Sequence, residues 1–151
     1  MQPGTIFLSI LPSAGAVAEA GLLVASSGKV LSPLGAALLT GLVAVMILVV
    51  TAGFLVHDLG AGGALATLGV QTVSAITTFA SIYHDAGFVQ NGHPSWADSF
   101  YFSIVTWTTL GYGDFTILPP FHLVAAAEAM LGYLCFGLIV SFLSAAAIRS
   151  G

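Results

Sequence analysis

A ten-residue stretch in the C-terminal third of the chain, TWTTLGYGDF (residues 106–115), combines three threonines, two glycines and an aspartate. Successive carbonyls of an extended strand point to opposite sides, so they can face one axis only if residues alternate between ordinary and left-handed dihedrals. Glycine adopts positive φ at little steric cost, and Gly111 and Gly113 supply it at every second position. The pattern predicts a row of carbonyl oxygens from Thr109 to Tyr112, with the threonine hydroxyl below it. Such oxygens can replace the hydration shell of a monovalent cation.

The composition indicates that this segment belongs to a membrane protein. Of the 151 residues, 58% are apolar and 5% are charged, whereas a soluble domain carries roughly a quarter charged residues. Two cations and six anions are too few to build a soluble surface, so most of the surface must face lipid. The scarcity of lysine and arginine also argues against nucleic acid as a partner.

Enzymatic chemistry is not expected. The sequence contains no catalytic constellation, and we expect the protein to be no enzyme and to need no cofactor. The single cysteine, Cys135, can form no internal disulfide, and we interpret it as a small apolar residue of a membrane helix.

Three apolar stretches are long enough to cross a bilayer. We predict membrane helices over residues 34–58, 59–84 and 119–149. At a rise of about 1.5 Å per residue, each exceeds the ~30 Å of the hydrocarbon core. A tight turn at His57 and Asp58 should join the first two helices.

The N-terminal segment, residues 1–33, is harder to assign. Its stretch 5–27 is apolar on average but contains Pro12, Glu19 and several glycines. No basic residue precedes it, so the pattern of a cleaved signal peptide is poor. It is either an extra membrane helix or a flexible or interfacial arm.

A shorter helix is predicted between the second and third membrane helices. Residues 85–94, DAGFVQNGHP, are polar and turn-rich, which is typical of a loop at the membrane surface. Ser95 and Asp98 then form a capping-box pattern that marks a helix start. A helix over residues 95–108 reaches only about 20 Å, too short to cross the bilayer. The extended backbone after it must therefore form a re-entrant loop, which protein buries or which lines a watery cavity.

These features together resemble the pore domain of the potassium-channel family, whose filter usually reads Thr-Val-Gly-Tyr-Gly-Asp. Residues 109–114 read TLGYGD, with leucine in place of valine. The chain is most similar to small bacterial members of the two-helix type, in which LPP follows the filter, as it does at residues 118–120. The resemblance covers residues 60–148 and leaves residues 1–33 without a counterpart.

The resemblance implies an all-α integral membrane fold. An outer helix (59–84) is followed by a re-entrant pore helix (95–108), a selectivity filter (109–114) and an inner helix (119–149). One or two extra N-terminal membrane segments precede them. Four copies would form a homotetramer around one pore. The protein would be a multi-pass protein of the cell membrane, plasma or bacterial inner, surrounded by lipids.

The resemblance also implies which residues bind the permeant ion. K⁺ would be coordinated by Thr109, Leu110, Gly111 and Tyr112, and Gly113 would complete the filter. The expected function is passive conduction of K⁺. A non-selective cation channel and a non-conducting, channel-like membrane subunit remain alternatives. A secondary transporter would show repeated halves, and none are visible.

The residues expected to support the filter differ from those in some members of the family. Some relatives place a glutamate on the pore helix, paired with the aspartate that matches Asp114. The corresponding residue here is Val105, whose side chain cannot form a hydrogen bond. We expect Glu128, approaching from the inner helix, to be a hydrogen-bonded structural residue behind the filter. Thr108 is assigned to the same support.

Aromatic packing is the second expected support. Trp107, Tyr101 and Phe102 should surround Tyr112, with Trp107 or Tyr101 hydrogen-bonded nearby, because an indole N–H is a donor that needs an acceptor.

The inner helix carries weaker signals. Gly132 matches a hinge glycine of the family if one deletion after the filter is allowed, although Gly137 could equally serve close helix packing. On the same alignment, Phe136 and Val140 would line the cavity below the filter, against the alternative that they face lipid or pack between helices. The sequence shows no ladder of Arg or Lys on a helix, so we expect no steep voltage dependence.

Overall fold

The computed structural model describes residues 32–57, 61–90 and 92–150. Their helices are α2 (Pro33–His57), α3 (Ala61–Ala86), α4 (Trp96–Trp107), the 3-10 helix η1 (Pro119–Phe121) and α5 (His122–Ser150). Apart from one isolated bridge between Phe88 and Ile117, these residues form no β-structure. The predicted all-helical fold is therefore confirmed for the part of the chain that the structure describes.

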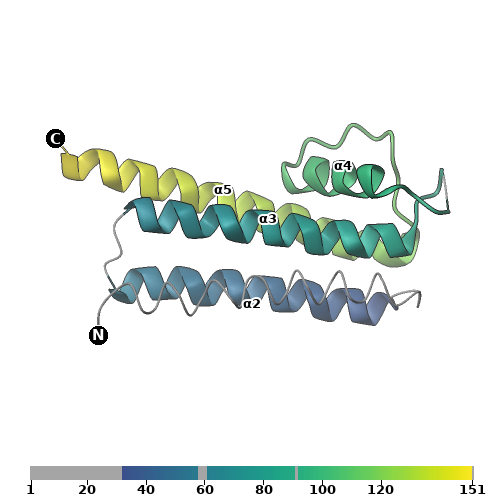
Figure 1. Ribbon diagram of the computed structural model, residues 1–151, viewed down its shortest axis with the longest axis horizontal. Coiled ribbons are helices and arrows are strands. Elements are labelled where there is room, and N and C mark those ends of the chain that lie inside the picture. The colour runs from purple at the N-terminus through teal and green to yellow at the C-terminus, as the bar shows by residue number, and fades with distance from the viewer. Residues whose placement is uncertain (1–31, 58–60, 91, 151) are drawn as a thin grey trace.

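The three long helices lie side by side, and α4 lies against one end of them (Figure 1). Helix α3 packs against α2, α4 and α5, and it runs antiparallel to both long neighbours (Figure 1). After α4 the chain turns back along that helix to the end at which it began (Figure 1). This is the re-entrant path that the short predicted helix requires.

Within the part of the chain that the structure describes, two helices are long and apolar enough to cross a membrane, Gly62–Ala86 and Pro119–Ala145. They correspond to the predicted outer and inner helices. Helix α2 occupies the range predicted for an additional membrane helix, and its place in the bilayer stays a prediction. The N-terminal segment 1–31 and the turn at 58–60 lie outside the described residues.

The described helix ends lie close to the predicted ones, and the clearest difference is at the end of α3. This helix continues through Asp85, which the sequence placed in a loop, and ends at Ala86. Gly87 then adopts φ 78°, and its N–H donates to the carbonyl of Tyr83 over 2.9 Å. A left-handed glycine with this bond is a common way to end a helix.

The start of α4 confirms the predicted capping box. The Ser95 hydroxyl accepts from the N–H of Asp98 at 3.2 Å, and the Asp98 carboxylate accepts from the N–H of Ser95 at 3.0 Å. Both contacts satisfy backbone donors that have no partner within the helix. With its 12 residues, α4 spans about 18 Å and cannot cross a bilayer.

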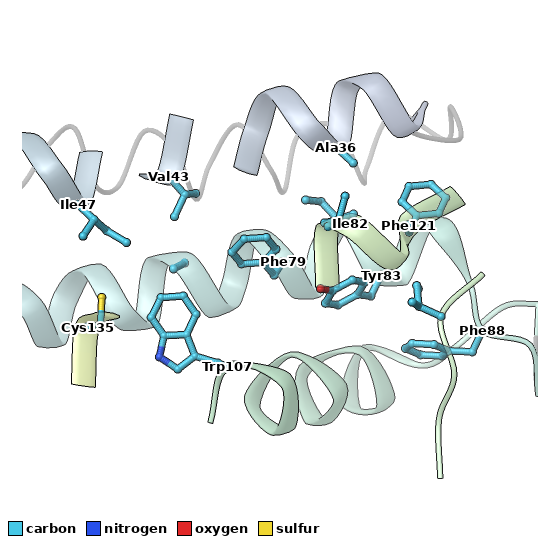
Figure 2. Packing of buried hydrophobic residues seen from close by; sticks show 13 residues of the cluster. Ala36, Val43, Ile47, Phe79, Ile82, Tyr83, Phe88, Trp107, Phe121 and Cys135 are labelled. Carbon is cyan, nitrogen blue, oxygen red and sulfur yellow. The ribbon is translucent and has the colours of Figure 1, made fainter. Parts of the chain in front are cut away.

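The core lies where α3 meets the other helices (Figure 2). Its buried apolar residues are Ala36, Val43, Ile47, Ala75, Phe79, Ile82, Tyr83, Phe88, Trp107, Ile117, Phe121, Val124 and Cys135. Of the membrane-length segments, that of α3 is 56% buried and that of α5 is 22% buried. Most of α5 is therefore left open for contacts that a single chain does not provide.

Helix α3 buries several hydroxyl residues, and two of them bond to its own backbone. Thr78 donates to the carbonyl of Ser74 at 2.9 Å, and Ser81 donates to that of Thr77 at 2.8 Å. Hydroxyls four residues from a carbonyl can always be satisfied in this way. Thr78 and Ser81 are therefore small residues that let neighbouring helices approach closely while their own hydroxyls stay paired.

Candidate functional site

The segment after α4 begins with a tight backbone turn. Thr108 caps the helix with its N–H bonded to Ile104 at 3.0 Å. The N–H of Thr109 bonds to the carbonyl of Thr106, and that of Leu110 to the carbonyl of Val105, each at 2.9 Å. The last turn of α4 therefore sets the position from which the predicted filter starts.

The filter backbone alternates in the way the two glycines predict. Gly111 has φ 56° and Gly113 has φ 78°, so positive φ recurs at every second residue. Such alternation is what a row of carbonyls facing one axis requires. The structure extends it one step further back, because Thr109 has φ 58°.

The conformation of Thr109 is a feature that sequence reasoning missed. A positive φ is unusual for any residue with a side chain and is an outlier for a β-branched one. It costs on the order of 1–3 kcal/mol, which the surrounding structure must offset. Strain of this kind is concentrated at functional segments, and here it falls on the first residue of the predicted filter.

The filter is open on one side within a single chain. Leu110 is 57% exposed and Tyr112 is 66% exposed. A Cβ atom added to Gly111 or to Gly113 would meet no atom within 4 Å. One chain therefore forms a single wall at these residues and leaves their other side open.

The outer end of the filter is held by a tyrosine of α4. The phenol of Tyr101 donates to Oδ2 of Asp114 at 2.7 Å, and the N–H of Phe115 donates to Oδ1 at 3.1 Å. The rings of Tyr101 and Tyr112 stack with centroids 6.4 Å apart and planes 5° from parallel. The hydrogen bond to Asp114 raises the pKa of Tyr101 to about 12. The sequence offered two hydrogen-bond donors near the filter, Trp107 and Tyr101, and Tyr101 is the one that donates to Asp114.

The other two aromatic residues pack into the core within one chain. Phe102 contacts Tyr83 edge-on at 4.8 Å between centroids, so it points into the core. Trp107 is also buried, beside Cys135 (Figure 2). Of the three residues, Tyr101 is therefore the one that stacks on Tyr112 within a single chain. The expectation that all three surround Tyr112 stays a prediction for an assembly of several chains.

Val105 stands where some relatives have a glutamate, and it contributes through its backbone. Its side chain is buried, and its carbonyl accepts the N–H of Leu110.

Glu128 is hydrogen-bonded behind the pore helix, as expected. It is fully buried, with 0% exposure. Tyr83 of α3 donates to its Oε2 at 2.5 Å, and Ser103 of α4 lies 2.6 Å from its Oε1. One carboxyl group of α5 thus joins all three helices that position the filter.

A loop residue that sequence reasoning missed holds the segment after the filter. Gln90 accepts from the N–H of Thr116 at 3.0 Å and donates to its hydroxyl at 3.3 Å. The N–H of Val89 donates to the carbonyl of Thr116 at 2.8 Å. The sequence marks these residues only as part of a polar loop, so no signal in it pointed to the pairing.

Gly132 lies against the end of the pore helix. A methyl group there would be 2.0 Å from the carbonyl oxygen of Trp107, so only glycine allows this approach. Helix α5 continues through this residue, and the hinge stays a prediction. Gly137 has no atom within 4 Å of an added Cβ, so it provides no close packing within one chain.

A pocket of about 520 Å³ reaches Thr109, the first residue of the predicted filter, and is lined by residues of α3, α4 and α5. Phe136 lines it together with Thr109 and Gly132, and its place in the cavity of an assembled pore stays a prediction. Val140 is exposed, and its place in a cavity stays a prediction. Among the described residues, no group of three or more His, Cys, Asp and Glu side chains could hold a metal ion.

The comparisons with known proteins agree with this geometry. A family model described as an ion channel matches residues 66–149, which include most of α3, all of α4, the filter and nearly all of α5. No curated protein and no solved structure matches the chain.

Proposed function

The chain belongs to this ion channel family, whose model covers more than half of it, and we propose that it forms a potassium-selective channel. Membership makes it a membrane transport protein and not an enzyme. The proposed pore conducts K⁺ passively and excludes Na⁺, and K⁺ is its permeant ion and not a cofactor.

The observation that carries the selectivity is the alternating backbone of TLGYGD. Positive φ at Thr109, Gly111 and Gly113 is what aims successive carbonyls at one axis. Carbonyl rings that replace the hydration shell are the basis of K⁺ selectivity. We therefore assign K⁺ coordination to Thr109, Leu110, Gly111 and Tyr112, each contributing oxygen from one wall.

The proposed assembly is a homotetramer, which supplies four walls around the axis. Two observations support assembly of several chains. The filter residues are exposed in one chain, and so is most of α5, including Met130, Tyr133 and Phe136. Apolar side chains of this size are covered in a membrane either by neighbouring copies or by lipid.

The proposed location is the cell membrane, with the filter mouth facing outward. Helix α2 is then a third membrane helix on the outside of the pore domain. It contacts η1 as well as α3 and α5. Since it runs antiparallel to α3 (Figure 1), Pro33 lies on the same side as the filter mouth and His57 on the cytoplasmic side.

Ion flux into liposomes from the purified protein tests this function. We expect K⁺ uptake without comparable Na⁺ uptake, and the mass of a tetramer in detergent. Equal uptake of both ions would support a non-selective cation channel. Absence of uptake, with the protein folded, would support a non-conducting membrane subunit, and a functional monomer or trimer would exclude the proposed assembly.

A further inference from the structure

Four oxygen-bearing groups meet in the buried network around Glu128. The Tyr83 hydroxyl lies 2.5 Å from Oε2, and the Ser103 hydroxyl lies 2.6 Å from Oε1. The Ser103 hydroxyl also lies 3.1 Å from the carbonyl oxygen of Ile76. The network therefore contains three oxygen–oxygen contacts of hydrogen-bond length.

The hydroxyl groups alone do not supply enough protons for these contacts. Tyr83 and Ser103 carry one hydroxyl proton each, and neither an ionised carboxylate nor a carbonyl carries any. With Glu128 ionised, Ser103 can donate to the carboxylate or to Ile76, and the other contact is left without a proton.

A proton on Oε1 of Glu128 completes the set. The carboxylic acid then donates to Ser103, Ser103 donates to Ile76, and Tyr83 donates to Oε2. Three protons serve three contacts, and every oxygen has a partner. A buried network in which every member is satisfied is more stable than one that is partly satisfied.

The charges near Glu128 lead to the same protonation state. A fully buried carboxylate needs a paired cation or it becomes neutral. The side chains that face it are Tyr83 from α3 and Ser103 from α4, and neither is a cation. Arg149 follows on the same helix about 32 Å away at the usual helical rise.

Four other titratable groups on the neighbouring elements have contacts elsewhere. His84 of α3 stacks on Trp96, and His122 of α5 contacts the carbonyl of Ile117 at 3.0 Å. On α4, Asp98 belongs to the capping box, and Tyr101 bonds to the filter mouth. The described side chains of α2 and η1 include no titratable residue.

We infer that Glu128 is a positioning residue that holds a proton. As a neutral acid it completes a continuous chain of hydrogen bonds from Tyr83 through Ser103 to Ile76, which holds α4 against α3 and α5. Since α4 sets the start of the filter, the proton on Glu128 positions the filter without touching an ion. The protonation of Glu128 does not depend on the proposed function. Its expected effect on K⁺ flux does rest on that function.

Glutamine is the matched replacement for a protonated glutamate. In E128Q the amide oxygen can accept from Tyr83 and the amide N–H can donate to Ser103, so the chain of hydrogen bonds is kept. In E128A the Tyr83 hydroxyl loses its acceptor, and the Ser103 hydroxyl keeps only the carbonyl of Ile76. The conservative variant should therefore restore what the alanine variant loses.

Infrared spectroscopy of the reconstituted protein tests the proton directly. The wild type should show the C=O stretch of a protonated carboxylic acid at neutral pH, and E128Q should lack that band. A wild-type spectrum without such a band, or a band that persists in E128Q, would overturn the inference, whether or not the protein conducts ions.

K⁺ flux tests the positioning role. We expect the K⁺ flux of E128A to be roughly ten-fold or more below that of wild type, because the buried Tyr83 hydroxyl is left without an acceptor and α4 loses its link to α5. E128Q should restore most of the flux. A K⁺ flux of E128A equal to that of wild type would overturn the positioning role of Glu128. A flux of E128Q as low as that of E128A would overturn it as well. If wild type shows the infrared band but neither wild type nor the variants conduct K⁺, the proposed function fails and the protonation of Glu128 stands.

Discussion

The phenol oxygen of Tyr101 lies 2.7 Å from Oδ2 of Asp114 and donates a hydrogen bond to it. This contact joins the pore helix to the outer end of the filter, at the position where a carboxylate pair is missing. The same tyrosine stacks on Tyr112. One side chain of α4 therefore restrains both the filter tyrosine and the aspartate that follows the filter.

Removing the hydroxyl of Tyr101 should weaken the filter mouth. In Y101F the stacked ring remains and only the donor to Asp114 is lost. We expect a decrease of about two- to five-fold in K⁺ over Na⁺ selectivity, because a single solvent-accessible hydrogen bond has a modest effect. Flux ratios in liposomes measure it, with D114N as the partner variant. Additive effects in the double variant Y101F/D114N would contradict a direct contact between the two groups.

Alkaline pH should loosen the same contact. Because Asp114 raises the pKa of Tyr101 to about 12, the neutral phenol is favoured in the folded state. Its contribution to stability is complete below an unfolded pKa of about 10 and is lost as the pH rises through about 12. Between these pH values, the melting temperature of the protein should fall more steeply for wild type than for Y101F. Identical curves would contradict this.

Adding a methyl group to Gly132 should displace the inner helix from the pore helix. In G132A the new carbon would lie 2.0 Å from the carbonyl oxygen of Trp107, so α5 must shift. Overpacking of this kind typically costs about 1–3 kcal/mol. G137A is the matched control, because a Cβ there meets no atom within 4 Å. Thermal melting should be lowered only in G132A, and equal effects of the two changes would argue against this packing.

The side chain of Gln90 should protect the backbone amide of Thr116, which follows the filter, from hydrogen exchange. Its side chain occupies the N–H of Thr116, so Q90A should raise the hydrogen-exchange rate of that amide. Q90E keeps an acceptor oxygen and should preserve most of the protection, although it loses the donor to the Thr116 hydroxyl. An exchange rate in Q90A equal to that of wild type would show that the pairing does not form in solution.

The local features of the site could be predicted from the sequence. The capping box of Ser95 and Asp98 depends on residues three apart, and the positive φ of Gly111 and Gly113 depends on glycine itself. Thr109 could not be predicted in the same way, because a β-branched residue disfavours its conformation and only the surrounding structure imposes it.

The partners of the buried and mouth residues depend on how the helices pack. Tyr83 and Glu128 are 45 residues apart, and their contact follows from the relative rotation of α3 and α5. The sequence indicated that Glu128 needs hydrogen bonds but not which helix would supply them. The sequence also could not decide which of two neighbouring aromatic residues on α4, Tyr101 or Phe102, stacks on Tyr112 within one chain.

The reversal potential of the purified channel in a planar bilayer, with K⁺ on one side and Na⁺ on the other, tests the central claim most directly. Each tenfold preference for K⁺ shifts this potential by about 59 mV for a monovalent ion. We expect wild type to reverse far from zero in the direction set by K⁺, and G113A to lose this selectivity or its current. A wild-type potential near zero, or an unchanged potential in G113A, would contradict the assignment of TLGYGD as a potassium filter.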